Sequence, residues 1–408
     1  FSAVIFVGYA GQHGWNIGLG SIWIGIGNAI FGCLLAWMLL AKRTRTMTHT
    51  LKSKTMPEFF EGRFNSTKMK VFAAIIIFVF LVPYSAAVYK GLGSMFTTIF
   101  PTVSVNTWML VIAVLTAIYL VLGGYVATAY TDFVQGIIMI VGVFAMVVAI
   151  VKNPNVGGFS HFFSNLASVA DNGDKITGDQ LTSWYGGANW KFLCVNILLT
   201  SFGTWGLPQM VSKYYAVKDI KSIHKATVIS TVFALIIGAG AYFVGSLSRL
   251  VLNNQLPEGG VDAVIPNTLL TALGDPNIVT TIILAVILIL LLSASMSTLS
   301  SIVLSSASAI SVDLIPAVNK NYSGKNTNDF NKSTLSFVRC TFIHIRNGQH
   351  YDYSKYYVIQ LGHSIRLFYR SLHMGYLFKE NNKSRCLGRY DSWIFDCCGY
   401  NNRAYINE

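Results

Sequence analysis

Charge is scarce in this chain of 408 residues. Asp, Glu, Lys and Arg make up 12% of the sequence, whereas 53% of it is hydrophobic, and soluble domains carry about twice that share of charge. Nine prolines and six cysteines are present, and the cysteines form neither a CxxC zinc pattern nor a disulfide framework. These shortages argue against a soluble globular domain, a zinc module and a small disulfide-rich secreted fold.

Long apolar runs take the place of the missing charge. Several reach the roughly 20 residues that cross a bilayer. The sequence predicts an all-α, multi-pass protein of the cell (plasma) membrane, with one transmembrane domain over 1–335 and the lipid bilayer as its surroundings. Because the chain begins at Phe1 rather than Met, its first span is expected to be a remnant. The predicted spans are 1–12, 17–41, 70–99, 106–125, 127–151, 189–212, 225–252 and 276–312.

Basic residues alternate from loop to loop. Segment 42–70 holds eight Lys/Arg against two Glu, and segment 213–225 holds four Lys against one Asp. The intervening segment 152–188 has two Lys against three Asp, and 253–275 has acids alone. This alternation follows the positive-inside rule and predicts that the basic loops are cytoplasmic. It also accounts for the net charge of +13 without a nucleic-acid partner.

The segment 278–315 combines a very apolar first half with ten Ser/Thr side chains between Ser293 and Ser311. Hydroxyl oxygens at mid-depth in a membrane helix suit a hard, weakly held cation such as sodium. The alternative is that these hydroxyls bond carbonyls one turn back, or that they let helices pack closely. The sequence alone leaves both interpretations open.

Helix-weakening residues gather in two spans that lie five spans apart. Glycine and proline free backbone groups that only a protein-lined cavity can satisfy in a membrane. Their spacing favours an inverted-repeat transporter with a site near the midplane, although glycine and proline are common in membrane helices in general. The residues are Gly8, Gly11 and Gly14 in the first span, and Gly203, Gly206 and Pro208 in the sixth.

A polar patch joins the fourth and fifth spans. Gly123 and Gly124 permit a turn, and Asp132 and Gln135 follow one helical turn apart. Thr131 and Asp132 are expected to cap the fifth helix. Because the charge pattern places this corner in the cytoplasm, we favour a cap and gate-stabilising corner over an ion ligand.

Ionisable residues near span interiors are few. Lys90, Asp132 and Arg249 all lie close to span ends, where snorkelling or capping is expected. No nucleophile and base are paired, so a membrane-embedded enzyme is disfavoured. A sensor or a channel remains an alternative.

Four motifs in order resemble the sodium:solute symporter family, which includes proline, pantothenate, sialic acid and sodium–glucose carriers. GGYVATAYTDFVQG (123–136) is similar to its GG-x-x-A-x-x-x-TD-x-x-Q signature. TMPEFFEGRF (55–64) resembles its LPEFLxxRF loop. WGLPQMVSKYYAVKD (205–219) is similar to its sixth core helix, with a Lys where the family usually has Arg. SASMSTLSSIVLSSAS (293–308) resembles its eighth core helix.

The resemblance implies two inverted five-helix repeats, a LeuT-like core, and a sodium-coupled symporter that imports a small organic solute by alternating access. Sodium is then the coupling ion, with no other cofactor. The implied sodium ligands are the Ala294 carbonyl, the Ser297 and Thr298 hydroxyls and the Phe1 carbonyl. Ala294, Ser297 and Thr298 share one helix face because their spacings are i, i+3 and i, i+4.

The resemblance also implies a solute site beside the helix breaks. Sugar carriers of the family tend to have Gln at the position of Ile5, which argues against a sugar. The implied solute-binding residues are Ser2, Ile5, Tyr9, Tyr84, Thr204 and Trp205. For Tyr84 and Trp205 the alternative is an ordinary packing role.

Residues 336–408 break the pattern. They contain no bilayer-length apolar run, yet they hold ten Lys/Arg, four of the eight His and four of the six Cys. The family would place its ninth and tenth core helices here. We expect a polar tail that is disordered or out of frame, which would leave an incomplete symporter. The alternative is an inactive fragment of a symporter.

Overall fold

The computed structural model describes residues 2, 4–274, 277–318, 332–338 and 340–341, and over these residues the chain is helical with no strand. Six helical segments are long and apolar enough to cross a membrane: Val4–Leu51, Thr67–Ile99, Val105–Leu122, Thr128–Val151, Lys221–Val251 and Ile278–Val318. The multi-pass, all-α prediction is therefore confirmed. The eight predicted spans become six because the first two form one helical run and the sixth is broken into short pieces.

The first half of the chain contains η1 (Val4–Tyr9), α1 (Ala10–Ile17), η2 (Gly18–Ser21), α2 (Ile22–Gly27), η3 (Asn28–Leu34), η4 (Trp37–Ala41), α3 (Lys42–Leu51), α4 (Met56–Phe64), α5 (Thr67–Ile99), α6 (Val105–Val151), α7 (Gly158–Ala167), α8 (Gly178–Thr182) and η5 (Gly187–Asn189). The second half contains α9 (Trp190–Gly203), η6 (Thr204–Gly206), α10 (Pro208–Ala216), α11 (Ile220–Ser246), α12 (Ser248–Val251), η7 (Gly260–Ala263), α13 (Val264–Leu273), α14 (Ile278–Ser308), η8 (Ala309–Leu314) and α15 (Ile315–Val318).

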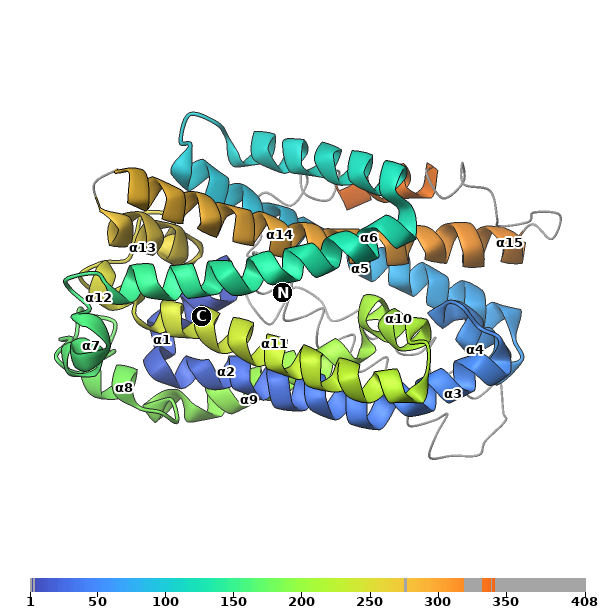
Figure 1. Ribbon diagram of the computed structural model, residues 1–408, viewed down its shortest axis with the longest axis horizontal. Helices are drawn as coiled ribbons and strands as arrows, with labels where there is room; N and C mark the ends of the chain where they lie inside the picture. The colour runs from blue at the N-terminus through green and yellow to red at the C-terminus, as the bar shows by residue number, and fades with distance from the viewer. Residues whose placement is uncertain (1, 3, 275–276, 319–331, 339, 342–408) are drawn as a thin grey trace, which may run out of the picture.

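The short helices sort to the two ends of a long bundle. Figure 1 gathers α3, α4, α10 and α15 at one end, and α7, α8, α12 and α13 at the other. The first group adjoins the basic segments and the second adjoins the acidic ones. The arrangement thus agrees with the two sides that the charge pattern predicts.

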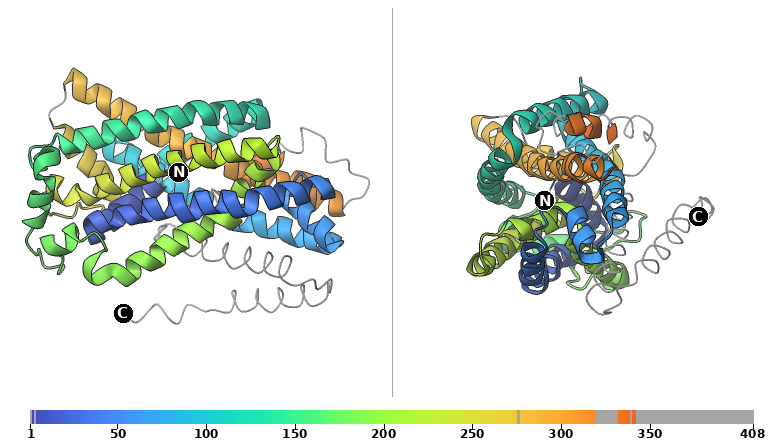
Figure 2. Two further views of the ribbon diagram at one scale, coloured as in Figure 1. Left: turned by 60° about the horizontal axis from the view of Figure 1, so that its bottom comes forward. Right: turned by 90° about the vertical axis from the view of Figure 1, so that its right-hand side faces the viewer.

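The first span is not broken where its glycines lie, so that prediction is wrong. The chain is helical from Val4 to Ile17, and the interruption comes at Gly18, whose φ of 73° is in the left-handed region. Gly14 instead allows close packing, because a methyl group there would overlap the backbone of Gly245 on α11. Gly25 and Gly238 make a second such approach. The two views of Figure 2 show α2 lying along α11.

The predicted fourth and fifth spans are the two legs of one hydrogen-bonded helix, α6. Figure 1 shows α6 bending sharply, so that the direction of the chain reverses between its two legs, Val105–Leu122 and Thr128–Val151. Gly123 and Gly124 lie between the legs, as predicted. The expected helix cap at Thr131 and Asp132 is wrong because the helix does not begin there.

The sixth span is broken as predicted. α9 ends at Gly203, a short 3-10 turn follows, and α10 begins at Pro208. Leu207 between them is extended, with ψ of 125°. Proline suits the first turn of a helix, where its missing N–H would have no partner anyway.

The loops and the start of the predicted tail also contain short helical segments. The polar loop 152–188 contains the short helix α7, and the acidic loop 253–275 contains α13, which was not predicted and packs against α1, η1 and α5. Within the predicted tail, Phe337 is fully buried against Phe78, and Thr341 is hydrogen-bonded to Ser85 at 2.9 Å. Residues 342–408, most of that tail, lie outside the described residues.

Candidate functional site

Two of the predicted sodium ligands meet on one face of α14. The Thr298 hydroxyl donates to the Ala294 carbonyl across 3.0 Å, and Ala294 is fully buried. This is the one-turn-back bond that Ser and Thr form in membrane helices. It also holds two oxygen atoms side by side, which is what a small cation needs.

Ser297 makes a different contact. Its hydroxyl donates to Asp132 Oδ1 on α6 across 2.8 Å, and Asp132 Oδ2 accepts from Lys213 Nζ on α10 at 3.3 Å. Asp132 therefore connects α14 to the second half of the broken sixth helix. The sequence motifs drew attention to Asp132, and to Lys213 as a lysine where the family usually has arginine. They did not predict that the two residues are in contact, because these lie 81 positions apart.

A cavity of about 40 Å³ lies at this corner between α6, α10 and α14. Such a volume has room for water-sized occupants but not for an organic solute. In this conformation the corner is therefore closed to a solute. The residues that line the cavity are Thr128, Ala129, Asp132, Gln209, Ser212, Lys213, Ser301, Leu304 and Ser305.

The other predicted corner residues have smaller roles. Gln135 lies one turn beyond Asp132, and its Oε1 is buried without a hydrogen-bond partner among the described residues. Pro208 starts α10. Gly123 and Gly124 mark the bend of α6.

The first-helix part of the predicted site is only partly described. Phe1, the expected fourth sodium ligand, lies outside the described residues. Ser2 and Tyr9 are buried, and Ile5 is half-buried. Tyr84 on α5 is buried in the same apolar cluster as Tyr9, and η1 packs against α5. These positions therefore surround one junction between the first and third core helices.

Thr204 and Trp205 belong elsewhere. Trp205 lies in a separate apolar cluster with Ala36 and Leu40, and its Nε1 donates to the Phe31 carbonyl at 2.8 Å. The Thr204 hydroxyl donates to the Ser201 carbonyl of its own turn. The predicted solute set is thus divided between two clusters, and Trp205 has a packing role against the second span.

The sequence did not predict a charged cluster at the opposite end of the bundle, which holds α7, α8, α12 and α13. Arg249 is 1% exposed, so the snorkelling expected for it is wrong. Its Nε donates to the Trp15 carbonyl at 2.7 Å, its Nη2 reaches Asp174 Oδ2 at 2.6 Å, and its Nη1 bonds Asn254. Its guanidinium also lies 4.5 Å from the centre of the Trp15 ring. One buried arginine thereby ties the external loop to α1 and α12.

The contact with Arg249 changes the pKa of Asp174. Partial burial pushes the pKa of Asp174 upward, but hydrogen bonds and the charge of Arg249 outweigh it and hold the pKa below its ordinary value. Only the arginine could have been suspected from the sequence. Its partner is one of three aspartates in a polar loop.

A second charged cluster lies at the end that the charge pattern predicts to be cytoplasmic. Asp313 is fully buried, and its Oδ1 accepts from the Thr55 hydroxyl at 2.7 Å and lies 3.8 Å from Lys70 Nζ. Thr55 also accepts from the Glu58 amide and so caps α4. The loop motif that contains Thr55 is therefore fastened to the end of the eighth core helix.

In the part of the chain that the structure describes, no three His, Cys, Asp or Glu side chains form a group that could hold a metal ion. The α14 oxygens are hydroxyls and a carbonyl, and such ligands suit a weakly held monovalent cation better than a transition metal. This donor set fits sodium as a transported ion.

A family profile decides the relationship. The profile of the sodium:solute symporter family matches residues 1–355. The chain belongs to the sodium:solute symporter family. The match reaches into the segment predicted to be a polar tail. Family members and relatives of this chain are transporters rather than enzymes.

Curated relatives from Bacillus subtilis (strain 168) include the osmoregulated proline transporter OpuE, 27% identical over 77% of this chain and 63% of that protein, and the high-affinity proline transporter PutP, 29% identical over 73% and 60%. The sodium/proline symporter of Salmonella typhimurium is 28% identical over 78% and 63%. The chain thus spans about six tenths of the length of these relatives.

A solved structure of a Na+-coupled sialic acid symporter in a substrate-bound, outward-open state aligns with a TM-score of 0.67 and 19% identity, covering 90% of this chain and 75% of that one. This likeness confirms the predicted fold class, an inverted-repeat symporter core.

Proposed function

We propose that this chain belongs to a sodium-coupled symporter that imports a small organic solute across the plasma membrane by alternating access, without catalytic chemistry and with sodium as coupling ion. The observation that carries the proposal is the group of oxygen atoms on one face of α14. The Thr298 hydroxyl oxygen lies 3.0 Å from the Ala294 carbonyl oxygen, and the Ser297 hydroxyl is oriented by its hydrogen bond to Asp132. Family membership supports the coupling ion.

Sodium supplies the driving force in this proposal. Its binding would join the first helix to α14 and favour a state that accepts solute, and coupling requires only that both ligands prefer the same conformation. Each charge that moves inward gains about 2.3 kcal/mol per 100 mV. That energy sustains a solute ratio of about fifty, since about 1.4 kcal/mol corresponds to a factor of ten.

The described part of the solute site favours a compact, partly apolar solute. Ile5 offers no hydrogen bond, and Tyr9 and Tyr84 lie among apolar side chains. A polyhydroxylated sugar would leave hydroxyls unpaired there at about 1–3 kcal/mol each. The proline named for the curated relatives agrees with this reasoning, so proline is the first solute to test. Sialic acid, named for the solved structure, is a polyhydroxylated sugar acid, and the same reasoning predicts that it is a poor solute for this chain.

The test is uptake of labelled proline by proteoliposomes that contain the full chain, under an inward sodium or potassium gradient. We expect proline uptake under the sodium gradient and none under the potassium gradient. The variants Ser297→Ala and Thr298→Ala should lose the sodium-driven uptake. Ser308→Ala is the matched control because Ser308 bonds only its own helix. Equal uptake under both gradients would overturn sodium coupling. A sodium-specific rise in melting temperature measures ion binding separately from transport.

A further inference from the structure

The cytoplasmic end of the second span has an exposed stripe that changes character along its length. Met38 and Leu39 are 64% and 45% exposed, and Lys42 and Arg43, one turn later, are exposed as well. The intervening Leu40 and Ala41 are buried. Because positions i, i+3 and i+4 share a helix face, this face passes directly from apolar to basic at the junction of η4 and α3.

The start of α11 repeats the same change in the opposite chain direction. Lys221 and Lys225 are exposed, and Val228 and Ile229 follow on the same face with 62% and 68% exposure. Ile223 between the lysines is buried. An exposed apolar face on a membrane helix contacts lipid tails. The lysines that follow this face therefore lie at the boundary between the lipid tails and the headgroups.

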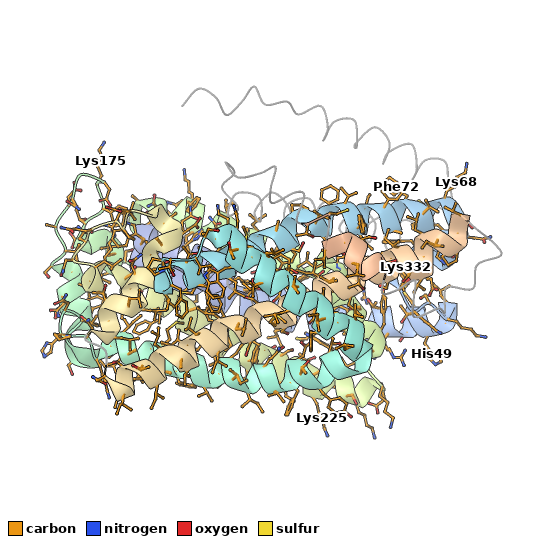
Figure 3. The ribbon with its side chains drawn as sticks, turned by 90° about the horizontal axis from the view of Figure 1, so that it is seen from above. His49, Lys68, Phe72, Lys175, Lys225 and Lys332 are labelled. Carbon is orange, nitrogen blue, oxygen red and sulfur yellow. The ribbon has the colours of Figure 1, made fainter. Side chains whose placement is uncertain are left out.

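These two stripes are neighbours. Ala41 and Ile223 belong to one apolar cluster, and η4 contacts α11. The cluster also holds Tyr214 of α10, whose ring meets the Trp37 ring edge-on at 4.9 Å. Figure 3 labels His49 and Lys225 at the same end of the molecule, opposite Lys175. Both helices therefore cross the tail–headgroup boundary side by side.

The four basic side chains of these stripes are not neutralised by ion pairs. The ion pairs among the described residues involve Lys70, Lys213 and Arg249. Asp219, directly before α11, caps this helix by accepting from the Ser222 amide, and it attracts Lys225 without forming an ion pair. We call Lys42, Arg43, Lys221 and Lys225 the basic cradle.

We propose that the basic cradle binds the phosphate headgroup of an anionic lipid in the cytoplasmic leaflet. Four Lys/Arg directly outside two packed membrane helices are the pattern that attracts anionic headgroups. The apolar stripes beneath the charges offer a surface for acyl chains, which a soluble anion would not use. The lipid would bridge the second and seventh core helices and brace α10, which packs against both η6 and α3.

The experiment compares the full chain in nanodiscs of pure phosphatidylcholine with nanodiscs that contain phosphatidylglycerol. The test variant is Lys42→Gln/Arg43→Gln/Lys221→Gln/Lys225→Gln. The matched control removes four other exposed charges: Lys54→Gln/Lys68→Gln/Lys152→Gln/Lys175→Gln. The readouts are the melting temperature and the number of phosphatidylglycerol molecules that stay bound in detergent, counted by mass spectrometry. Neither depends on transport or on sodium.

We expect phosphatidylglycerol to raise the melting temperature of the native chain by several degrees, with the test variant losing more than half of this rise and the control keeping it. Each helix contributes to the site, so Lys42→Gln/Arg43→Gln and Lys221→Gln/Lys225→Gln should each lose part of it even if the fourfold variant fails to fold. An undiminished rise in both pair variants would overturn the proposal. So would an equal rise with inorganic phosphate in detergent, because that marks a soluble-anion site.

Discussion

Ser297 donates its hydroxyl hydrogen to Asp132 across 2.8 Å, so a predicted sodium ligand on α14 is oriented by a carboxylate on α6. A hydroxyl that gives its hydrogen away keeps both lone pairs for another partner. The bond therefore turns the Ser297 oxygen into a ready acceptor for a cation. This is a stronger reason for the importance of Asp132 than the helix cap that the sequence suggested.

Replacing Asp132 tests this orientation. In Asp132→Ala the Ser297 hydroxyl loses its acceptor, and we expect the half-saturating sodium concentration to rise about tenfold, which corresponds to one hydrogen bond of about 1.4 kcal/mol. The measurement is the sodium dependence of uptake or of the melting temperature. Gln135→Ala, one turn further on, should leave it within about twofold. The same shift in both variants would contradict the specific role of Asp132.

Removing the carboxylate partner of Arg249 should destabilise the external end. Arg249 is buried whereas Asp174 is partly exposed, so we expect Asp174→Asn to cost about 1–2 kcal/mol, between the values for exposed and buried pairs. Thermal unfolding in detergent measures the loss. Asp179→Asn removes an exposed acid of the same loop and should change little. An equal melting temperature for the two variants would show that the ion pair contributes nothing.

Acid should weaken the same pair. The pKa of Asp174 is lowered in the folded state, so its stabilisation is present at neutral pH and is lost as pH falls through that lowered value, below about 4. The native chain should therefore lose more stability on acidification than Asp174→Asn does. Parallel pH profiles of melting temperature for the two proteins would refute this.

The glycine contact between α1 and α11 should not accept a side chain. A methyl group at Gly14 would overlap the Gly245 backbone, whereas one at Gly136 would meet only Phe233 at 3.7 Å. We expect Gly14→Ala to cost about 1–3 kcal/mol or to prevent folding, and Gly136→Ala to be neutral. Yield of monodisperse protein and melting temperature report the difference. A Gly14→Ala protein as stable as the native chain would disprove the close approach.

The Thr55 hydroxyl has two roles, since it caps α4 and donates to buried Asp313. Thr55→Val should cost about 2–3 kcal/mol, because a lost cap costs about 1 and a buried carboxylate oxygen loses a donor. Thr46→Val removes an exposed hydroxyl that bonds only its own helix, and should stay within about 0.5 kcal/mol. Thermal unfolding compares the two variants, and equal losses would argue against the link between α4 and η8.

Sequence patterns predicted most of the spans because apolar length is a local quantity. The break at Gly203–Pro208 was equally legible, since glycine and proline act on their own backbone. The glycines of the first span were wrongly predicted to break the helix, because the sequence shows only their local effect on the backbone. Whether a glycine breaks a helix or lets another helix approach depends on the partner, and Gly245 lies far away in the chain.

The candidate site was predicted only in part. The i, i+4 spacing of Ala294 and Thr298 follows from helix geometry, and their contact is therefore foreseeable. The Ser297–Asp132 bond and the Arg249–Asp174 pair join segments 165 and 75 positions apart, and no local pattern encodes them. Trp205 was assigned to the solute by the family resemblance, whereas its position against Phe31 follows from packing.

The backbone contacts of Gly14 with Gly245 and of Gly25 with Gly238 have a consequence for spectroscopy. Helices that touch without intervening side chains have no layer that could slide or repack, so α1, α2 and α11 must keep their spacing in every conformation. Two spin labels, one on α2 and one on α11, would report a constant distance throughout a transport cycle. That pair supplies an internal ruler against which the displacement of any other labelled helix can be measured.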